Sequence, residues 1–396
     1  MTPEVKERIE QIRHGNVPEG YKKGKLGIVP VDWEEVPFST IFTSTSDYTD
    51  DLAQYPLYSL TIEDGITPKT ERYERSHLVK KENSYKIVRP NDYAYNPMNI
   101  RFGAVARHKG DCDVAVSGYY DIFTTVHESD LPFMDNFLTC GPMITYYNKV
   151  STGSLIEKQR VHFSDFMEFC LVLPSIGERK RIAEILTVQE NVIELKEKLL
   201  SEKQRQKKYL MQQLLTAKKR LPGFLETWKS KQIGDVLSIR HGKNQQEIEK
   251  STGKYPILGT GGEIGRTDKF LCDKPSVLLG RKGTINNPRY MDTPFWTIDT
   301  LYYTDIKSGY SAKYLYYVFC NINWMQYNEA SGVPSLNSHT IEGVRISIPD
   351  LNEQMAIAGV LTDFDNEIGL IIKSIEQEKQ KKKALMQLLL TGIVRV

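Results

Sequence analysis

The sequence lacks several features that would place it in a specialised class of protein. Its five cysteines are scattered singly along 396 residues without a C-x-x-C pair, which argues against a disulfide framework and against a zinc site. It contains no run of about 20 apolar residues and no apolar secretory stretch at its start. No H-x-x-x-H spacing occurs either. We therefore expect a cytoplasmic protein with no membrane partner and no metal site.

The chain also lacks the motifs of common catalytic proteins. No G-x-x-x-x-G-K-[ST] loop is present, and the glycine-rich segment 259–265 has Ile264 where a dinucleotide loop needs its third glycine. Segments 96–99 and 287–290 begin like the N-P-P-[YF] motif of adenine-N6 methyltransferases, but both lack the second proline. We therefore expect no catalytic residue on this chain and no cofactor bound to it.

A large excess of charge of one sign is missing as well. The 52 Lys and Arg residues nearly balance the 50 Asp and Glu residues, which gives a net charge of +2. Residues 20–172 carry 16 basic against 21 acidic residues (net −5), whereas residues 173–220 carry 12 against 6 (net +6). If the partner is nucleic acid, local patches or another subunit must provide the attraction to phosphate.

The chain does contain an internal repeat. Residues 173–216 match residues 348–391 without a gap, at an offset of 175. Neither copy has a proline after its first turn, so both are predicted to form long helices. The matched pairs include Pro174/Pro349, Glu178/Glu353, Ile182/Ile357, Ala183/Ala358 and Leu186/Leu361.

Both helical copies carry apolar residues at alternating steps of three and four, the spacing of a coiled-coil seam. Gln189, Lys196, Lys203 and Lys207 interrupt the first seam, so we expect imperfect pairing in the middle. We predict that the two helices pack on each other as an antiparallel coiled coil. The residues predicted to pair the helices or to contact a partner subunit are Ile182, Leu186, Ile193, Leu200, Leu210, Leu214, Ile357, Leu361, Phe364, Ile368, Ile371, Ile375, Leu385 and Leu389.

Two further regions are predicted to be mixed, mostly β domains. They hold short runs of Tyr, Thr, Val and Ile separated by Gly, Pro, Asn and Asp. A fainter repeat at an offset of 195 aligns their beginnings, including Trp33 with Trp228. We therefore predict an α+β fold with pseudo-twofold symmetry. Its segments are a helical N-terminal segment at 1–19, β-rich domains at 20–172 and 221–347, a central helix at 173–220 and a C-terminal helix at 348–396.

Basic and amide side chains cluster inside both β-rich domains. Arg and Lys can bind guanine, Asn and Gln suit adenine, and glycines permit close approach to phosphate. One such cluster is typical of any surface loop, but one set in each repeated domain favours DNA binding. The candidate DNA-binding residues are Lys69, Arg72, Arg75, Asn99, Arg101, Arg107 and Lys109 in the first domain, and Arg240, Lys243, Thr260, Arg266, Arg281, Lys282 and Arg289 in the second.

Several motifs lie at the entries to the domains and helices. They are Gly20-Tyr21-Lys22-Lys23…Asp32-Trp33, Arg220-Leu221-Pro222-Gly223-Phe224…Trp228, Pro174…Glu178…Ile182-Ala183 and Pro349…Glu353-Gln354…Ile357-Ala358. With these motifs, essentially the whole chain resembles the specificity subunits of type I restriction–modification systems.

The resemblance implies a noncatalytic subunit that reads a bipartite, asymmetric target in double-stranded DNA. Each β-rich domain would be a target-recognition domain for one half-site, and the helices would act as a ruler for the unread spacer. Two modification subunits with adenine-N6 methyltransferase activity would dock on the helices. Two restriction subunits with ATP-dependent translocation and endonuclease activity are an optional further partner. S-adenosylmethionine, ATP and Mg²⁺ would then bind to the partner subunits.

Two alternatives from other classes stay open. The first is an adenine methyltransferase with recognition and catalysis on one chain, which binding of S-adenosylmethionine by the isolated protein would reveal. The second is a coiled-coil scaffold without DNA contact, which a gel shift with the partner subunits present would decide.

Overall fold

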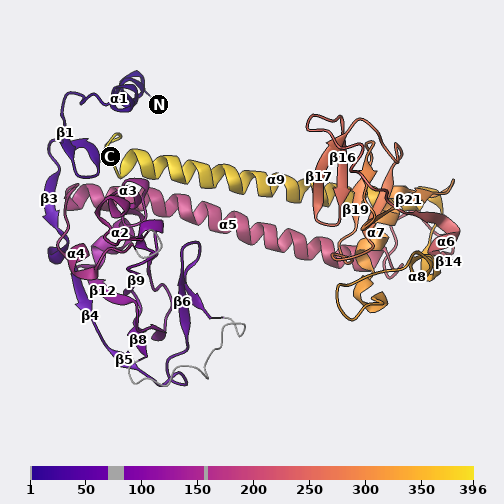
Figure 1. Cartoon of the computed structure of the whole chain (residues 1–396), viewed down its shortest axis with the longest axis horizontal. Helices are drawn as coiled ribbons and strands as arrows, with labels where there is room; N and C mark the ends of the chain where they lie inside the picture. Colours follow the sequence, from indigo (N-terminus) through magenta and orange to yellow (C-terminus); the bar gives the residue numbers. More distant parts are fainter. Residues whose placement is uncertain (1, 70–83, 156–158) are drawn as a thin grey trace. The chain divides into compact units, whose positions relative to one another are not determined.

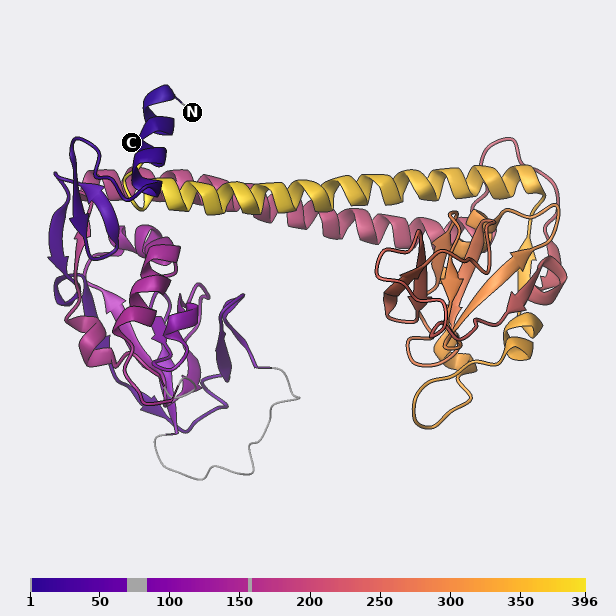
Figure 2. The same cartoon turned by 45° about the horizontal axis from the view of Figure 1, so that its top comes forward.

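The computed structural model describes residues 2–69, 84–155 and 159–396, and the chain divides into two compact units. Unit 1 consists of Met1–Leu195 and Ile375–Val396, and unit 2 consists of Lys196–Ser374. The long helices are α5 (Ile176–Leu214) and α9 (Leu351–Leu389). Each is divided between the two units: the first part of α5 and the last part of α9 belong to unit 1, and the remaining parts belong to unit 2. Within each unit, the two helix halves run antiparallel, side by side (Figures 1 and 2). The predicted α+β class is confirmed.

Unit 1 contains a four-stranded sheet of order β10-β9-β12-β4 and a three-stranded sheet of order β11-β8-β5. Their strands pair antiparallel, as do the two-stranded ladders β1–β2, β3–β13 and β6–β7. The strands are β1 (Tyr21–Gly24), β2 (Gly27–Pro30), β3 (Glu34–Pro37), β4 (Phe42–Thr45), β5 (Tyr48–Thr49), β6 (Tyr58–Thr61), β7 (Gly65–Pro68), β8 (Tyr85–Val88), β9 (Tyr93–Tyr95), β10 (Val105–Arg107), β11 (Val114–Ser117), β12 (Asp121–Thr125) and β13 (Cys170–Leu173). The shorter helices are α1 (Pro3–Arg13), α2 (Leu131–Phe137), α3 (Gly141–Val150) and α4 (Phe163–Met167).

Unit 2 repeats this layout with a four-stranded sheet of order β15-β21-β18-β19 and a three-stranded sheet of order β17-β16-β20. Strand β22, which pairs with β14, leads into α9, just as β13, which pairs with β3, leads into α5. The strands are β14 (Lys229–Gln232), β15 (Leu237–Arg240), β16 (Tyr255–Gly259), β17 (Gly262–Thr267), β18 (Ser276–Gly280), β19 (Arg289–Met291), β20 (Trp296–Thr297), β21 (Leu301–Ile306) and β22 (Arg345–Ile348). The shorter helices are α6 (Ile233–Val236), α7 (Ala312–Asn321) and α8 (Ser338–Gly343). No helix in the described ranges is long and apolar enough to span a membrane.

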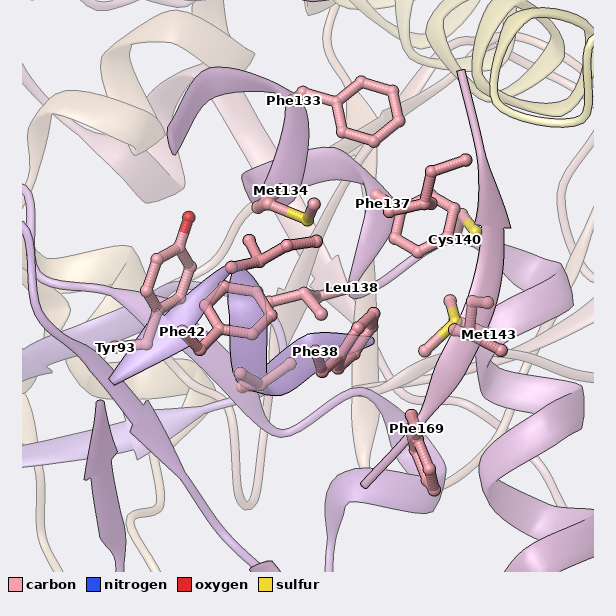
Figure 3. Close-up of a cluster of buried hydrophobic side chains, with 14 of the residues drawn as sticks. Phe38, Phe42, Tyr93, Phe133, Met134, Phe137, Leu138, Cys140, Met143 and Phe169 are labelled. Atoms are coloured by element: carbon pink, nitrogen blue, oxygen red, sulfur yellow. The ribbon is translucent and has the colours of Figure 1, made fainter. Parts of the chain in front are cut away.

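The core of unit 1 is rich in aromatic side chains. Phe42 from β4, Tyr93 from β9 and Phe133 from α2 face one apolar cluster (Figure 3). Phe38 and Phe42 meet edge to face with ring centroids 5.2 Å apart, a favourable arrangement for two aromatic rings. The cluster holds β4, β9, α2 and α3 together.

The ends of the long helices complete the cores of both units, which explains why the helical repeat is so close. Ile182 and Leu186 of α5 are buried in the core of unit 1 together with Leu389 of α9. Their equivalents 175 residues away, Ile357, Leu361 and Leu214, are buried in the core of unit 2. Each buried side chain contributes about 1.5–3 kcal/mol through loss of contact with water.

The remaining predicted pairing residues lie along the same helix faces. Buried among them are Ile193 and Ile375. The others are half-buried, namely Leu200, Leu210, Phe364, Ile368, Ile371 and Leu385. Leu214, Leu361 and the other residues at the helix ends pack on the domain cores as well as on the partner helix.

The polar middle of the two helices is joined by hydrogen bonds and ion pairs. In unit 1, Gln189 donates its side-chain amide to the carboxylate of Glu378 at 2.8 Å. In unit 2, Lys203 binds Glu367 at 2.7 Å and lies over the ring of Phe364. The apolar seam is interrupted here, as the sequence predicts, and the interrupting polar residues bind partners on the other helix, which a one-helix pattern cannot reveal.

A buried glutamate at the start of each long helix joins three parts of its unit. In the Glu353 cluster of unit 2, Glu353 accepts hydrogen bonds from Arg220 Nε at 2.6 Å, from Arg220 Nη2 at 2.7 Å and from Trp228 Nε1 at 3.0 Å. In the Glu178 cluster of unit 1, Glu178 accepts from Arg395 Nε at 2.6 Å and from Trp33 Nε1 at 3.1 Å. Each cluster links the start of one helix, a residue six positions beyond the end of the other, and a domain entry.

Candidate nucleic-acid interface

Four segments of unit 2 are joined by backbone hydrogen bonds into one loop cluster, and a fifth, 259–262, follows Leu258, whose carbonyl accepts from the N–H of Ile298 at 3.0 Å. We define this loop cluster as residues 241–244, 259–262, 280–284, 297–300 and 330–336. The segment 297–300 lies at its centre: its carbonyls accept from the backbone N–H of Lys243 at 2.8 Å and of Arg281 at 2.8 Å. The N–H of Leu336 donates to the carbonyl of Arg281 at 2.9 Å. The cluster therefore brings together loops that are far apart in the sequence.

Close backbone packing in this loop cluster requires glycine. A Cβ on Gly242 would lie 2.1 Å from the carbonyl oxygen of Ile298, and one on Gly280 would lie 2.3 Å from that of Thr284. No side chain fits at such distances, because real Cβ atoms essentially never approach closer than 3.0 Å. Gly242 therefore lets two loops approach closely, and Gly280 lets its own turn close.

The candidate side chains of unit 2 fall into two groups. Lys243 and Lys282 are exposed, and neither ammonium has a partner within the described ranges. Arg281 pairs with Asp299, and Arg289 donates to the carbonyl of Thr260 at 2.7 Å. The two lysines are thus available to an anion, whereas Arg289 positions the turn that carries Thr260.

Two further candidates of unit 2 lie outside the loop cluster. Arg240, at the end of β15, pairs with Asp305 at 3.4 Å. Arg266, on β17, pairs with Glu263 at 3.0 Å and donates from Nε to the carbonyl of Gly253 at 2.8 Å. The guanidinium groups of both residues therefore already have partners within their own domain.

In unit 1, Arg107 belongs to an internal network. Its Nε and Nη2 bind the carboxylate of Asp135 at 2.9 and 2.7 Å, and its Nη1 donates to Asn91 at 2.6 Å. Tyr93 donates its hydroxyl to the same carboxylate at 2.7 Å. Burial raises the pKa of Tyr93 well above its usual value, and the hydrogen bonds to Asp135 raise the pKa of Arg107. Arg107 therefore joins β10 to α2.

Two other candidates of unit 1 also have internal partners. Lys109 lies 3.8 Å from Asp135 and 3.9 Å from Glu190. Arg101 donates to Gln159 at 2.7 Å and stacks on the exposed ring of Phe102.

The remaining candidates of unit 1 are exposed or lie outside the described residues. Asn99 and Lys69 are exposed, the first in a loop and the second directly after β7. Arg72 and Arg75 lie outside the described residues. DNA contact by all the candidates stays a prediction.

Sequence reasoning missed the loop 330–336, which lacks basic residues and therefore carried no charge signal. It also missed Asp135, the acid that binds Arg107 and Tyr93. Among the residues that the structure describes, no three His, Cys, Asp or Glu side chains gather as metal ligands would.

Comparison with known proteins shows a consistent likeness. A family model described as the type I restriction modification DNA specificity domain matches residues 225–380. The chain is 24% identical to a putative type I restriction enzyme MjaX specificity subunit of Methanocaldococcus jannaschii, over 96% of this chain and 97% of that protein. It is 22% identical to the type I restriction enzyme EcoprrI specificity subunit of Escherichia coli, over 66% of each chain.

Two solved structures share the fold. The type I restriction–modification S subunit from M. genitalium has a TM-score of 0.59 and 13% identity, over 93% of this chain and 99% of that one. A chain from a structure on complex assembly and conformational transition of the type I R-M system has a TM-score of 0.57 and 15% identity, over 96% of this chain and all of that one.

Proposed function

Because the chain belongs to the specificity subunits of type I restriction–modification systems, we propose that it reads a bipartite, asymmetric sequence in double-stranded DNA for partner enzymes. A specificity subunit is a noncatalytic component of such complexes. The observation that carries the proposal is that two different strand-rich domains are built onto equivalent ends of a repeated helix pair. A repeated helix pair that carries two different domains suits the recognition of two different half-sites.

In this proposal each strand-rich domain reads one half-site in the major groove. In unit 2 the loop cluster supports this role, because it presents the exposed cations Lys243 and Lys282 on a backbone fixed by hydrogen bonds. Cations contact phosphate or guanine, and a preformed surface loses little conformational entropy on binding.

The long helices would set the distance between the half-sites. Each helix has 39 residues and is therefore about 58 Å long at 1.5 Å per residue. Two readers on one face of DNA must lie about one helical turn of ~34–36 Å, or a multiple of it, apart. A helix of about 58 Å is longer than one turn and shorter than two, so helices of this length would suit a spacing of one to two turns.

Partner subunits would dock on the helices. In unit 1, α5 exposes the apolar residues Ile185, Val188 (64% exposed) and Leu195 (65% exposed) at helical spacing, next to the face that packs against α9. We propose that this stripe contacts a modification subunit, of which two are expected. These would bind S-adenosylmethionine, and optional restriction subunits would bind ATP and Mg²⁺.

Methylome sequencing of the host with and without this gene tests the proposal. We expect one bipartite motif with adenine methylated in each half to disappear when the gene is deleted. For docking, Val188→Asp should reduce copurification of the modification subunit. The control Leu225→Asp, at a residue 92% exposed and off the helices, should not. An unchanged methylome would contradict the proposed function.

A further inference from the structure

The loop 330–335 of unit 2 is fixed from inside by the side chain of Asn328. Its Oδ1 accepts from the N–H of Ala330 at 3.2 Å and from the N–H of Ser335 at 2.9 Å, and its Nδ2 donates to the carbonyl of Ala330 at 2.8 Å. The N–H of Glu329 donates to the carbonyl of Ser335 at 3.1 Å and closes the base of the loop. The loop therefore keeps its shape without burying its tip.

The same loop is tied to the segment that carries Lys282. The N–H of Gly283 donates to the carbonyl of Pro334 at 2.8 Å, and Lys282 and Ser335 form an isolated antiparallel bridge. The loop is therefore held beside the backbone of Lys282, whose exposed ammonium has no partner in the described part of the chain.

The tip presents Val333, which is 66% exposed between small residues and a proline. A single exposed valine is ordinary on a protein surface. What distinguishes Val333 is its position on a fixed loop within the loop cluster of unit 2. Valine also has only one side-chain torsion, so it loses little rotamer entropy when it makes a contact.

The major groove offers a specific apolar feature for such a side chain. The 5-methyl group of thymine projects there, and small aliphatic groups recognise it by contact. We propose that Val333 contacts the 5-methyl group of a thymine in the half-site that unit 2 reads, with Lys282 bound to a neighbouring phosphate. The inference rests on the proposed function and names a specificity-determining residue for it.

Deoxyuridine, which differs from thymidine only by lacking this methyl group, provides the test. The full complex of this chain with its partner subunits is bound to duplexes of its methylome-derived target. Each thymine in both half-sites is replaced by deoxyuridine in turn, and Kd is measured for the wild type and for Val333→Ala. We expect one replacement, in one half-site only, to raise the Kd of the wild type about fourfold. This factor corresponds to the loss of ~0.8 kcal/mol for one buried methyl group.

The same replacement should leave the Kd of Val333→Ala unchanged, because its contact is already lost. The control Leu225→Ala, at an exposed residue outside the loop cluster, should keep the fourfold effect. Thermal denaturation of each variant checks that the fold is intact.

Two results would overturn the inference alone: an equal deoxyuridine effect in Val333→Ala, or a target with no thymine in either half-site. Failure of the wild-type complex to bind any specific sequence would instead overturn the proposed function, and the inference with it.

Discussion

The Glu353 cluster offers a sharp test of how helix and domain are joined in unit 2. The side chain of Glu353 is fully buried and accepts two hydrogen bonds from Arg220 and one from Trp228. In Glu353→Gln, one oxygen can still accept from Trp228, but the charge that binds the guanidinium is lost. The amide also places an N–H group opposite the donors of Arg220.

The expected cost follows from these bonds. Hydrogen bonds to a charged group contribute about 1.5–3 kcal/mol each. The bond from Arg220 Nε to Oε1 is lost, and the bond from Arg220 Nη2 to Oε2 loses its charged acceptor. Because Arg220 is partly exposed, water replaces part of this interaction, and we expect the free energy of unfolding to fall by about 2–3 kcal/mol. The equivalent change Glu178→Gln should destabilise unit 1 by a similar amount, since its carboxylate has equivalent donors.

Urea denaturation gives the total stability, and hydrogen exchange followed by mass spectrometry shows which unit opens. Glu353→Gln should increase exchange in unit 2, and Glu178→Gln in unit 1. Glu376→Gln, on the exposed face of α9, is the control and should change stability by less than about 0.5 kcal/mol. If Glu353→Gln unfolds at the same urea concentration as this control, the reasoning about the cluster is wrong.

Three further outcomes are expected. Gly242→Ala should destabilise unit 2 by about 1–3 kcal/mol, because the added Cβ meets a backbone oxygen, and an unchanged Tm would contradict this. Asp135→Ala should cost about 2–3 kcal/mol in urea denaturation, because Arg107 loses its counter-ion, and a neutral result would show that Arg107 is not structural. Burial raises the pKa of Cys140 to about 11, so at pH 8 iodoacetamide should alkylate the exposed Cys112 far faster in the native protein, and equal labelling by mass spectrometry would refute this.

The architecture could be predicted from the sequence because the long helices repeat without a gap. Positions such as Ile182 and Ile357 repeat because each packs into the core of a strand-rich domain, where size and shape are constrained. The sequence match ends at Thr216 and Thr391, so it did not include Arg220 and its equivalent Arg395. Their shared role became visible only through the glutamates that they bind.

The candidate DNA-binding residues were harder to predict, because residue type does not reveal the partner of a charged side chain. Arg107 and Lys243 look alike as cations in basic clusters, yet Arg107 binds Asp135 from a distant helix, whereas Lys243 is exposed without a partner in the described ranges. A contact between residues so far apart in the chain has no local sequence signal. The loop of Val333 was missed for the opposite reason, because it contains no charge.

The central proposal is that the helices hold two separate recognition domains apart. Inserting seven residues in register into both α5 and α9 lengthens each helix by about 10 Å, the rise of about three base pairs. Methylome sequencing of a host carrying this variant is the most direct test. We expect both half-site sequences to stay the same while the unread spacer grows by one to about three base pairs. A changed half-site sequence, or methylation at the original spacing, would contradict the proposal.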